Sequence, residues 1–132
     1  MRTKLVAIAV LASISSIAMA GLAKTVPVTV TVNADGSGNA SGNMASARAS
    51  GNDVEYIGCG VRKFVNPTGG VNTYGFCQAS DAAGVTVSCS TNNAELLDAV
   101  ENVADFSYVS FSYDAEGQCQ FIGVSTQSFY IP

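Results

Sequence analysis

Four cysteines constrain the fold of this chain more than any other feature of its 132 residues. Cys59, Cys77, Cys89 and Cys119 give an even number of thiols in a short chain that begins with an export-like leader. Small exported domains are typically cross-linked because their cores bury too little apolar surface to be stable alone. The sequence therefore predicts two disulfides. Four free thiols are the alternative, and zinc is disfavoured because there is no Cys-x-x-Cys spacing and no histidine.

The pairing of these cysteines is left open by their count, since four cysteines allow three connectivities. Cys59–Cys77 with Cys89–Cys119 is preferred because it joins strands that are neighbours in chain order. Cys77–Cys89 is the main competitor, because both residues flank one predicted hairpin. Each bond is expected to add about 3 kcal/mol of stability by restricting the unfolded chain.

Residues 1–20 have the three parts of a signal peptide: a basic start, an apolar run over residues 5–12, and small residues at Ala18 and Ala20. This pattern predicts cleavage after Ala20 and a single secreted β-rich domain over residues 21–132. A membrane span is disfavoured because the apolar run is shorter than the roughly 20 residues that cross a bilayer. We expect the protein in the periplasm or outside a bacterial cell.

The charges of residues 21–132 narrow the classes of partner. Ten acidic side chains face four basic ones, and only Arg62 and Lys63 are adjacent. Nucleic acid is excluded as a partner, because phosphate binding requires clustered Lys and Arg. Attachment to anionic lipid is disfavoured for the same reason.

The absence of histidine narrows the possible chemistry. The usual Ser-His-Asp and Cys-His nucleophile systems need an imidazole, as do most zinc and copper sites. We therefore expect a protein that is not an enzyme, with no catalytic residues, no cofactor and no bound metal.

Alternating apolar residues predict about seven short strands in a sandwich-like or layered, mostly β fold. Pro27 places the first strand at a sheet edge or at its own start. A Gly/Ser/Asn/Ala-rich stretch over residues 33–43 is predicted to be flexible. The strands are expected at 25–33, 44–50, 54–65, 72–79, 85–90, 109–113 and 119–124.

Two further elements are predicted near the C-terminus. An amphipathic helix is expected over residues 93–104, with Asn92 and Glu95 in a capping arrangement and an apolar stripe on one side. If Glu116 and Gly117 turn the last hairpin, then Val109 faces Val124 and Phe111 faces Ile122, so one face of the hairpin is apolar. The apolar tail, residues 128–132, is expected to pack as an edge.

Three patterns of polar residues suggest specific sites, but each has a simpler explanation. Residues 33–38 begin like a calcium loop, yet Met44 stands where a bidentate Glu is needed. Asp105, Asp114 and Glu116 would have to converge to hydrolyse a polymer, although Asp-x-Glu-Gly is ordinary turn chemistry. Asn39-Ala40-Ser41 is a glycosylation sequon that matters only in a eukaryotic secretory host.

The tyrosines offer a fourth candidate, a surface for sugar or peptide. More often such residues fill the edges of a β core. They are Tyr56, Tyr74, Tyr108, Tyr113 and Tyr130.

The sequence predicts a secreted, non-catalytic protein that recognises an unknown extracellular protein or glycan, either as a surface-recognition module or as an inhibitor. An inhibitor would present loop 65–72 or loop 33–43. The alternative is a subunit of an extracellular fibre assembled by strand addition, because residues 25–33 resemble the donor strands of fimbrial pilins over about ten residues. The cysteine layout and the interior helix depart from the pilin pattern. A small carboxylate-dependent hydrolase ranks last.

Overall fold

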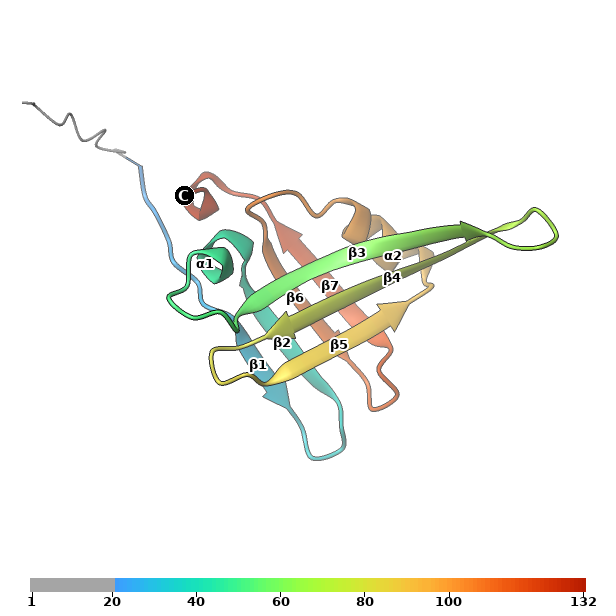
Figure 1. Cartoon of the computed structure of the whole chain (residues 1–132), viewed down its shortest axis with the longest axis horizontal. Coiled ribbons are helices and arrows are strands. Elements are labelled where there is room, and N and C mark those ends of the chain that lie inside the picture. Colours follow the sequence, from blue (N-terminus) through green and yellow to red (C-terminus); the bar gives the residue numbers. More distant parts are fainter. Residues whose placement is uncertain (1–20) are drawn as a thin grey trace, which may run out of the picture.

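A computed structural model describes residues 21–132, and the leader predicted over residues 1–20 lies outside the described residues. Seven strands form two antiparallel sheets, which confirms the mostly β prediction (Figure 1). The first sheet has the order β1-β2-β6-β7, and its strands are β1 Thr29–Val32, β2 Gly38–Asn43, β6 Tyr108–Tyr113 and β7 Cys119–Ser125. The second has the order β3-β4-β5, and its strands are β3 Tyr56–Val65, β4 Val71–Ser80 and β5 Thr86–Thr91.

The two sheets lie face to face, and the strands of one run across those of the other (Figure 1). The core between them takes alternate residues from each sheet, as the period-two pattern requires. Val109, Phe111 and Ile122 are buried from the first sheet, while Cys77 and Ala79 are buried from the second. Short helices connect the sheets: α1 Met44–Arg48 leads from β2 to β3, and α2 Ala94–Glu101 leads from β5 to β6. None of the helices in residues 21–132 is long and apolar enough to cross a membrane.

The region around β2 corrects the sequence prediction. Residues 38–43, which were assigned to a flexible stretch, form a strand in the interior of the first sheet, and residues 44–48 form α1 instead of a strand over 44–50. Side-chain volume explains the difference. The buried face of β2 carries only Gly38, Ala40 and Gly42 because bulky neighbours occupy the space: a Cβ atom at Gly38 would collide with Thr31 and with the Tyr113 ring.

Helix α2 is shorter than the predicted helix over residues 93–104, and its N-cap lies one residue later than expected. Asn93, not Asn92, is the N-cap, and its side-chain oxygen accepts hydrogen bonds from the backbone N–H groups of Glu95 and Leu96. Val100 is buried on the predicted apolar stripe. The amphipathic character was therefore predicted correctly, whereas the ends were not.

The first strand lies at a sheet edge, where Pro27 had placed it, but it covers only Thr29–Val32. Residues before it are held by other groups of the same chain. The Val26 N–H donates to Ser46 Oγ at 3.0 Å, and the Val26 carbonyl accepts from the Asn43 N–H at 3.1 Å. The Val28 N–H donates to a Glu55 carboxylate oxygen at 3.0 Å.

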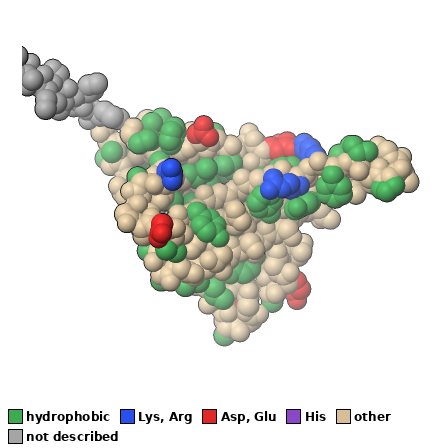
Figure 2. Space-filling view, in the orientation of Figure 1, with side chains coloured by type: hydrophobic (Ala, Val, Ile, Leu, Met, Phe, Trp, Pro, Cys, Tyr) green, Lys and Arg blue, Asp and Glu red, His purple; other side chains and the backbone are tan. Residues whose placement is uncertain are grey.

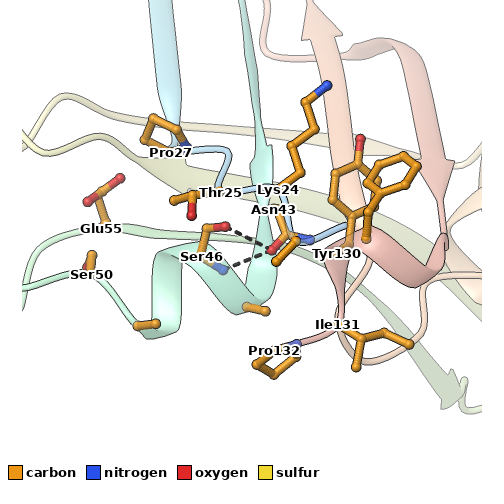
Figure 3. A pocket seen from close by; sticks show the side chains of 14 residues that line it. Lys24, Thr25, Pro27, Asn43, Ser46, Ser50, Glu55, Tyr130, Ile131 and Pro132 are labelled. Carbon is orange, nitrogen blue, oxygen red and sulfur yellow. Dashed lines mark hydrogen bonds between the residues drawn. The ribbon is translucent and has the colours of Figure 1, made fainter. Parts of the chain in front are cut away.

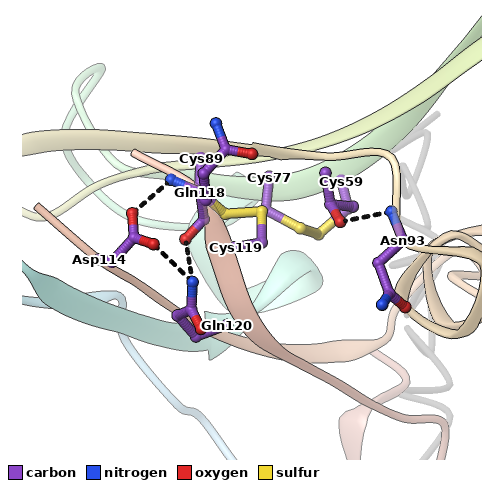
Figure 4. The surroundings of a disulfide bond; sticks show 9 residues. Cys59, Cys77, Cys89, Asn93, Asp114, Gln118, Cys119 and Gln120 are labelled. Carbon is purple, nitrogen blue, oxygen red and sulfur yellow. Dashed lines mark hydrogen bonds between the residues drawn. A yellow bond between two sulfur atoms is a disulfide. The ribbon is translucent and has the colours of Figure 1, made fainter. Parts of the chain in front are cut away.

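Both predicted disulfides are present, in the preferred pairing (Figure 4). Cys59 and Cys77 are directly opposite on β3 and β4, with Cα atoms 4.0 Å apart. Cys89 and Cys119 join β5 to β7 and therefore link the two sheets. The expectation that Cys89–Cys119 joins strands that are neighbours in chain order is wrong, because β6 lies between β5 and β7 in the chain.

The last hairpin has the predicted register, with Val109 opposite Val124 and Phe111 opposite Ile122. Its turn is longer than the expected two residues, because a bulge at Ser112/Tyr113 shifts the pairing before the chain reverses. The tail is not an edge strand. Residues Ser128–Tyr130 form a short 3-10 helix, and the Tyr130 ring stacks on Tyr108 with centroids 5.6 Å apart.

Candidate binding surface

The β3–β4 hairpin projects beyond the rest of the molecule (Figure 1). Strand β5 pairs only with Gly75–Ser80 of β4, so residues 62–74 form a two-stranded arm with no third strand beside it. The tip is ordered by Asn66, whose side-chain oxygen accepts hydrogen bonds from the N–H groups of Thr68 and Gly70. Gly69 supplies the positive φ of 85° that the turn requires. The arm therefore contains the predicted protruding loop 65–72.

Three aromatic rings form a row along the outer face of this hairpin, which we call the aromatic row. Phe64 and Tyr74 have centroids 6.4 Å apart, and Tyr74 and Phe76 are also 6.4 Å apart. Phe64 is 51% exposed and Tyr74 40%. The Phe76 ring lies over Gly60, where a Cβ atom would come within 2.8 Å of it. The glycine thus allows the ring to lie flat against the strand.

Arg62 adds a positive charge to the aromatic row. Its guanidinium carbon is 5.0 Å from the Phe76 ring centroid, at cation–π distance. The single ion pair within residues 21–132 is between Lys63 and Glu101, 2.6 Å apart, so no carboxylate neutralises Arg62 in this part of the chain. Figure 2 shows hydrophobic side chains along the arm, with Lys and Arg near its base.

A shallow hollow of about 450 Å³ continues the aromatic row toward β5. It adds hydrogen-bonding groups to the rings and the guanidinium: Gln78 and Ser88 are exposed, and Ser90 is half-buried. On the opposite face of the hairpin, the apolar side chains nearest the tip, Val65 and Val71, are 71% and 63% exposed. Taken together, the outer face offers flat apolar area, one unpaired cation and several hydrogen-bonding groups.

A second hollow, of about 390 Å³, lies between the N-terminal segment, α1 and the C-terminal tail (Figure 3). Its polar groups are already engaged in holding the chain together. Asn43 accepts from the Ser46 N–H at 2.8 Å, and Glu55 accepts from Val28 and Asn52. This hollow lies where three segments of the chain meet, and we assign it no ligand.

The calcium-like residues form the turn between β1 and β2. Asp35 Oδ1 accepts hydrogen bonds from the Ser37 N–H and hydroxyl, and these bonds hold the pKa of Asp35 below its usual value. Asn33 donates its side-chain amide to the Ser37 hydroxyl. Asn39, in the sequon, is an exposed residue of β2. Within residues 21–132, no three His, Cys, Asp or Glu side chains are arranged to hold a metal ion.

The three candidate carboxylates do not converge. Asp114 and Glu116 lie in the β6–β7 turn, while Asp105 precedes β6. They are therefore at opposite ends of a six-residue strand, about 20 Å long, whereas paired carboxylates in glycosidases lie within about 10 Å. Asp114 instead organises its own turn by accepting hydrogen bonds from the Gln118 N–H and the Gln120 side chain (Figure 4).

The five tyrosines do not share one surface: Tyr108 and Tyr130 stack on each other, and Tyr56 is exposed at the start of β3. Tyr113 is buried in the core, as expected for a residue that fills a β core, and burial raises its pKa. Tyr74 belongs to the aromatic row. The grouping of Arg62, Phe64 and Phe76 on one surface was not predicted from the sequence. Pairing residues 62–65 with 71–74 across the Asn66–Gly70 turn would have brought them together.

The fold and the surface define a small, disulfide-stabilised β-sandwich with a projecting aromatic arm. No family model matches the chain, and no curated protein or solved structure matches it.

The buried Tyr113 hydroxyl predicts a stability loss at alkaline pH. Burial raises the pKa of Tyr113, so the folded state favours the protonated phenol. The stability that this preference contributes is fully present below about pH 10, the pKa of Tyr in an unfolded chain, and it is lost as the pH rises through the higher pKa of the folded state. We expect Tyr113→Phe to reduce the loss of unfolding free energy between pH 9 and pH 11, measured by urea unfolding. Tyr74→Phe, which removes an exposed hydroxyl, should retain the full loss. Equal alkaline loss in both variants would contradict this assignment.

Proposed function

We propose that this chain is an exported, non-catalytic binding protein that recognises another extracellular protein through the outer face of its β3–β4 arm. The observation that carries the proposal is the aromatic row, three exposed or half-exposed rings with an unneutralised Arg62 placed against one of them. Tyr and Arg are enriched among the residues that contribute most to protein–protein affinity, and aromatic side chains are enriched in interface cores. The two disulfides are typical of proteins that fold in an oxidising compartment.

The shape of the arm favours a protein partner over a small molecule or a glycan. Small ligands are usually enclosed in concave sites, whereas the aromatic row lies on a projecting hairpin and the hollow beside it is shallow (Figures 1 and 2). The arm is also held in one conformation by the ladder between β3 and β4 and by the bonds of Asn66 at its tip. A preorganised hairpin loses little conformational entropy on binding.

The fibre alternative has less support. A donor strand must be free to leave its own chain, but Thr29–Val32 pair with β2 and the residues before them are bonded to Ser46, Asn43 and Glu55. The hydrolase alternative has less support still, because Asp105 lies far from Asp114 and Glu116.

The test is capture of partners from culture medium of the producing cells by the immobilised, oxidised protein. We expect the wild type to retain a protein that the double variant Phe64→Ser/Tyr74→Ser does not retain. Phe121→Ser is the matched control: it removes an aromatic ring that is also exposed, 53%, but that lies on the other sheet. Loss of two interface rings should weaken binding by a factor of about 100 or more, measured by surface plasmon resonance with the captured protein.

Two results would overturn the proposal. If the double variant and Phe121→Ser bind the captured protein equally well, the arm is not the contact surface. If the wild type instead sediments with insoluble polysaccharide and the double variant does not, the surface is right but the partner is a glycan. Both disulfides must be verified in each variant, because a misfolded arm would also abolish binding.

A further inference from the structure

Strand β3 is the free edge of the second sheet over its full ten residues. Cys59 and Cys77 are opposite each other with Cα atoms 4.0 Å apart, the spacing of a non-hydrogen-bonded pair. Hydrogen-bonded and non-hydrogen-bonded pairs alternate along an antiparallel ladder, so every odd-numbered residue of β3 is in a non-hydrogen-bonded pair with β4. The backbone N–H and C=O groups of these residues therefore point away from β4. Within residues 21–132, no other backbone group bonds to them. The five residues with free groups are Ile57, Cys59, Val61, Lys63 and Val65.

This edge lacks most of the features that usually prevent strand pairing. Natural edges are short, bulged, interrupted by proline, covered or charged. Of these features β3 has only the charges of Arg62 and Lys63 in its C-terminal half. Strand β3 has an unbroken register with β4 and contains no proline. The other edge strands are shorter: β1 has four residues, β5 has six and β7 has seven. Two of them are also partly occupied, because Glu55 accepts from the Val28 N–H just before β1 and the Ser90 N–H of β5 donates to the Gly117 carbonyl.

We propose that a second copy of this chain pairs with this edge, β3 against β3 in antiparallel orientation, about a two-fold axis at Val61. This register follows from the free groups themselves. It places Ile57 opposite Val65 of the second copy, Cys59 opposite Lys63, and Val61 opposite Val61. It is the antiparallel register in which all five residues with free groups on one copy meet all five on the other, so the ladder is complete.

The side chains on the outer face are complementary in the same register. Phe64 of one copy is opposite Gly58 of the other, and Arg62 is opposite Gly60. A Cβ atom at Gly58 would meet nothing within 4 Å, so the space above this glycine is open for a neighbouring ring. Phe64 of each copy therefore lies beside an open glycine of the other, the arrangement in which an aromatic residue covers a glycine across a strand pair. Gly60 is already covered by the Phe76 ring of its own chain, so the Arg62 position gains no such space.

The inner face provides a second fit. Val65, which is 71% exposed, is opposite Ile57 of the second copy. Next to Ile57 is a hollow of about 390 Å³, bounded on its other side by Met44 and Ala47 of α1. The antiparallel arrangement thus places one of the most exposed apolar side chains of the arm beside a hollow whose walls are apolar at Ile57, Met44 and Ala47 and largely polar elsewhere.

The charges along the edge also favour antiparallel pairing. The C-terminal half of β3 carries Arg62 and Lys63, while Asp53 and Glu55 precede its start. In the pair, Lys63 of each copy lies opposite Cys59 of the other, whereas a parallel, in-register pair would place each Lys63 beside the other copy's Lys63, so the antiparallel arrangement reduces repulsion between the basic halves. The dimer would have one continuous six-stranded sheet, with both aromatic rows on the same outer face. This inference does not depend on the proposed function.

The test compares two proline variants by sedimentation equilibrium of the oxidised protein over a range of concentrations. Val61→Pro removes an N–H that points away from β4, so it costs the monomer no ladder bond, but it deletes both hydrogen bonds at the two-fold axis. Thr73→Pro is the matched control, because Thr73 is also an odd-numbered arm residue but its free N–H lies on the opposite edge. We expect Val61→Pro to raise the dimer dissociation constant about 100-fold and Thr73→Pro to leave it within about threefold.

A second pair of variants covers the case in which proline disturbs the arm. Gly58→Gln fills the space above Gly58, which is open in the monomer, and should raise the dissociation constant at least about tenfold. Ser88→Gln adds the same side chain to the same outer face on β5, away from the β3 edge, and should have no effect. Hydrogen exchange gives an independent measurement: the amides of Val61 and Lys63 should be protected at high protein concentration and exchange freely on dilution.

A wild-type protein that stays monomeric at millimolar concentration would overturn the inference. A dimer that Val61→Pro and Gly58→Gln leave unchanged would overturn it as well, since that dimer would use another surface. Partner capture by monomeric Val61→Pro distinguishes the two proposals, because it would support recognition through the arm whether or not the β3 edge pairs.

Discussion

Replacing Cys89 and Cys119 by alanine is expected to lower the free energy of unfolding by about 3.5 kcal/mol. This bond closes a loop with a sequence separation of 30 residues and is one of two covalent cross-links in residues 21–132. It is also the covalent cross-link between the two sheets, so without it they are held by core packing, by the connecting segments and by hydrogen bonds such as that from the Ser90 N–H to the Gly117 carbonyl. Urea unfolding measures the change, and the dependence of the free energy on urea should become steeper because the unfolded chain exposes more surface.

The control is the double variant Cys59→Ala/Cys77→Ala, which removes a cross-link of separation 18 between strands that are already paired. Loop closure alone predicts a loss of about 3 kcal/mol, close to that of the first variant. Hydrogen exchange should separate the two variants: β5 and β7 lose protection together when the bond between the sheets is absent, and they keep it in the control. The same pattern of protection in both variants would contradict the inter-sheet role of Cys89–Cys119.

Asn43→Ala is expected to destabilise the protein by about 3 kcal/mol, although it deletes only one small side chain. Asn43 is 1% exposed. Its oxygen caps α1 by accepting from the Ser46 N–H, and its amide donates to the Phe106 carbonyl at 3.1 Å. Loss of the cap costs about 1 kcal/mol, and leaving the partly buried Phe106 carbonyl unpaired costs about 2 kcal/mol more. Thermal or urea unfolding provides the measurement.

The matched control for this change is Asn93→Ala, which removes the exposed cap of α2 and no buried hydrogen bond. It should cost about 1 kcal/mol. The difference between the two variants isolates the contact with Phe106, a non-glycine residue held at a positive φ of 65°. If both variants lose the same stability, the amide of Asn43 contributes nothing to holding that backbone conformation.

The parts of the fold that follow from local periodicity could be predicted from the sequence. Strands β5 and β6 alternate apolar residues with Ser or Thr, so their positions and the register of Phe111 with Ile122 could be predicted. The disulfide pairing was also preferred correctly. For Cys89–Cys119, however, the link between sheets depends on packing of the two sheets, which local pattern does not reveal.

The errors occur where tertiary contacts decide the structure. The buried residues of β2, Gly38, Ala40 and Gly42, resemble a flexible loop in sequence. In the structure, Thr31 and the Tyr113 ring leave no room for a side chain at Gly38, and Val28 leaves little at Gly42. The Ala-rich segment that follows is helical because Asn43 caps it, which its alternating alanines did not indicate. The aromatic row was missed because its members lie on both sides of a turn, and only the register of β3 with β4 makes them adjacent.

The structure of the arm also limits how the length of this hairpin can change in related chains or in designed variants. Beyond Lys63 it has no third strand beside it, so shortening the hairpin would leave the core intact. A change in the length of the hairpin should add or remove two residues in each strand. Deleting one residue from each would rotate Phe64 onto the face that Lys63 occupies, because side chains alternate along a strand. The length of the arm is therefore adjustable in steps of about 7 Å, and an odd-numbered deletion would turn the proposed recognition face inward.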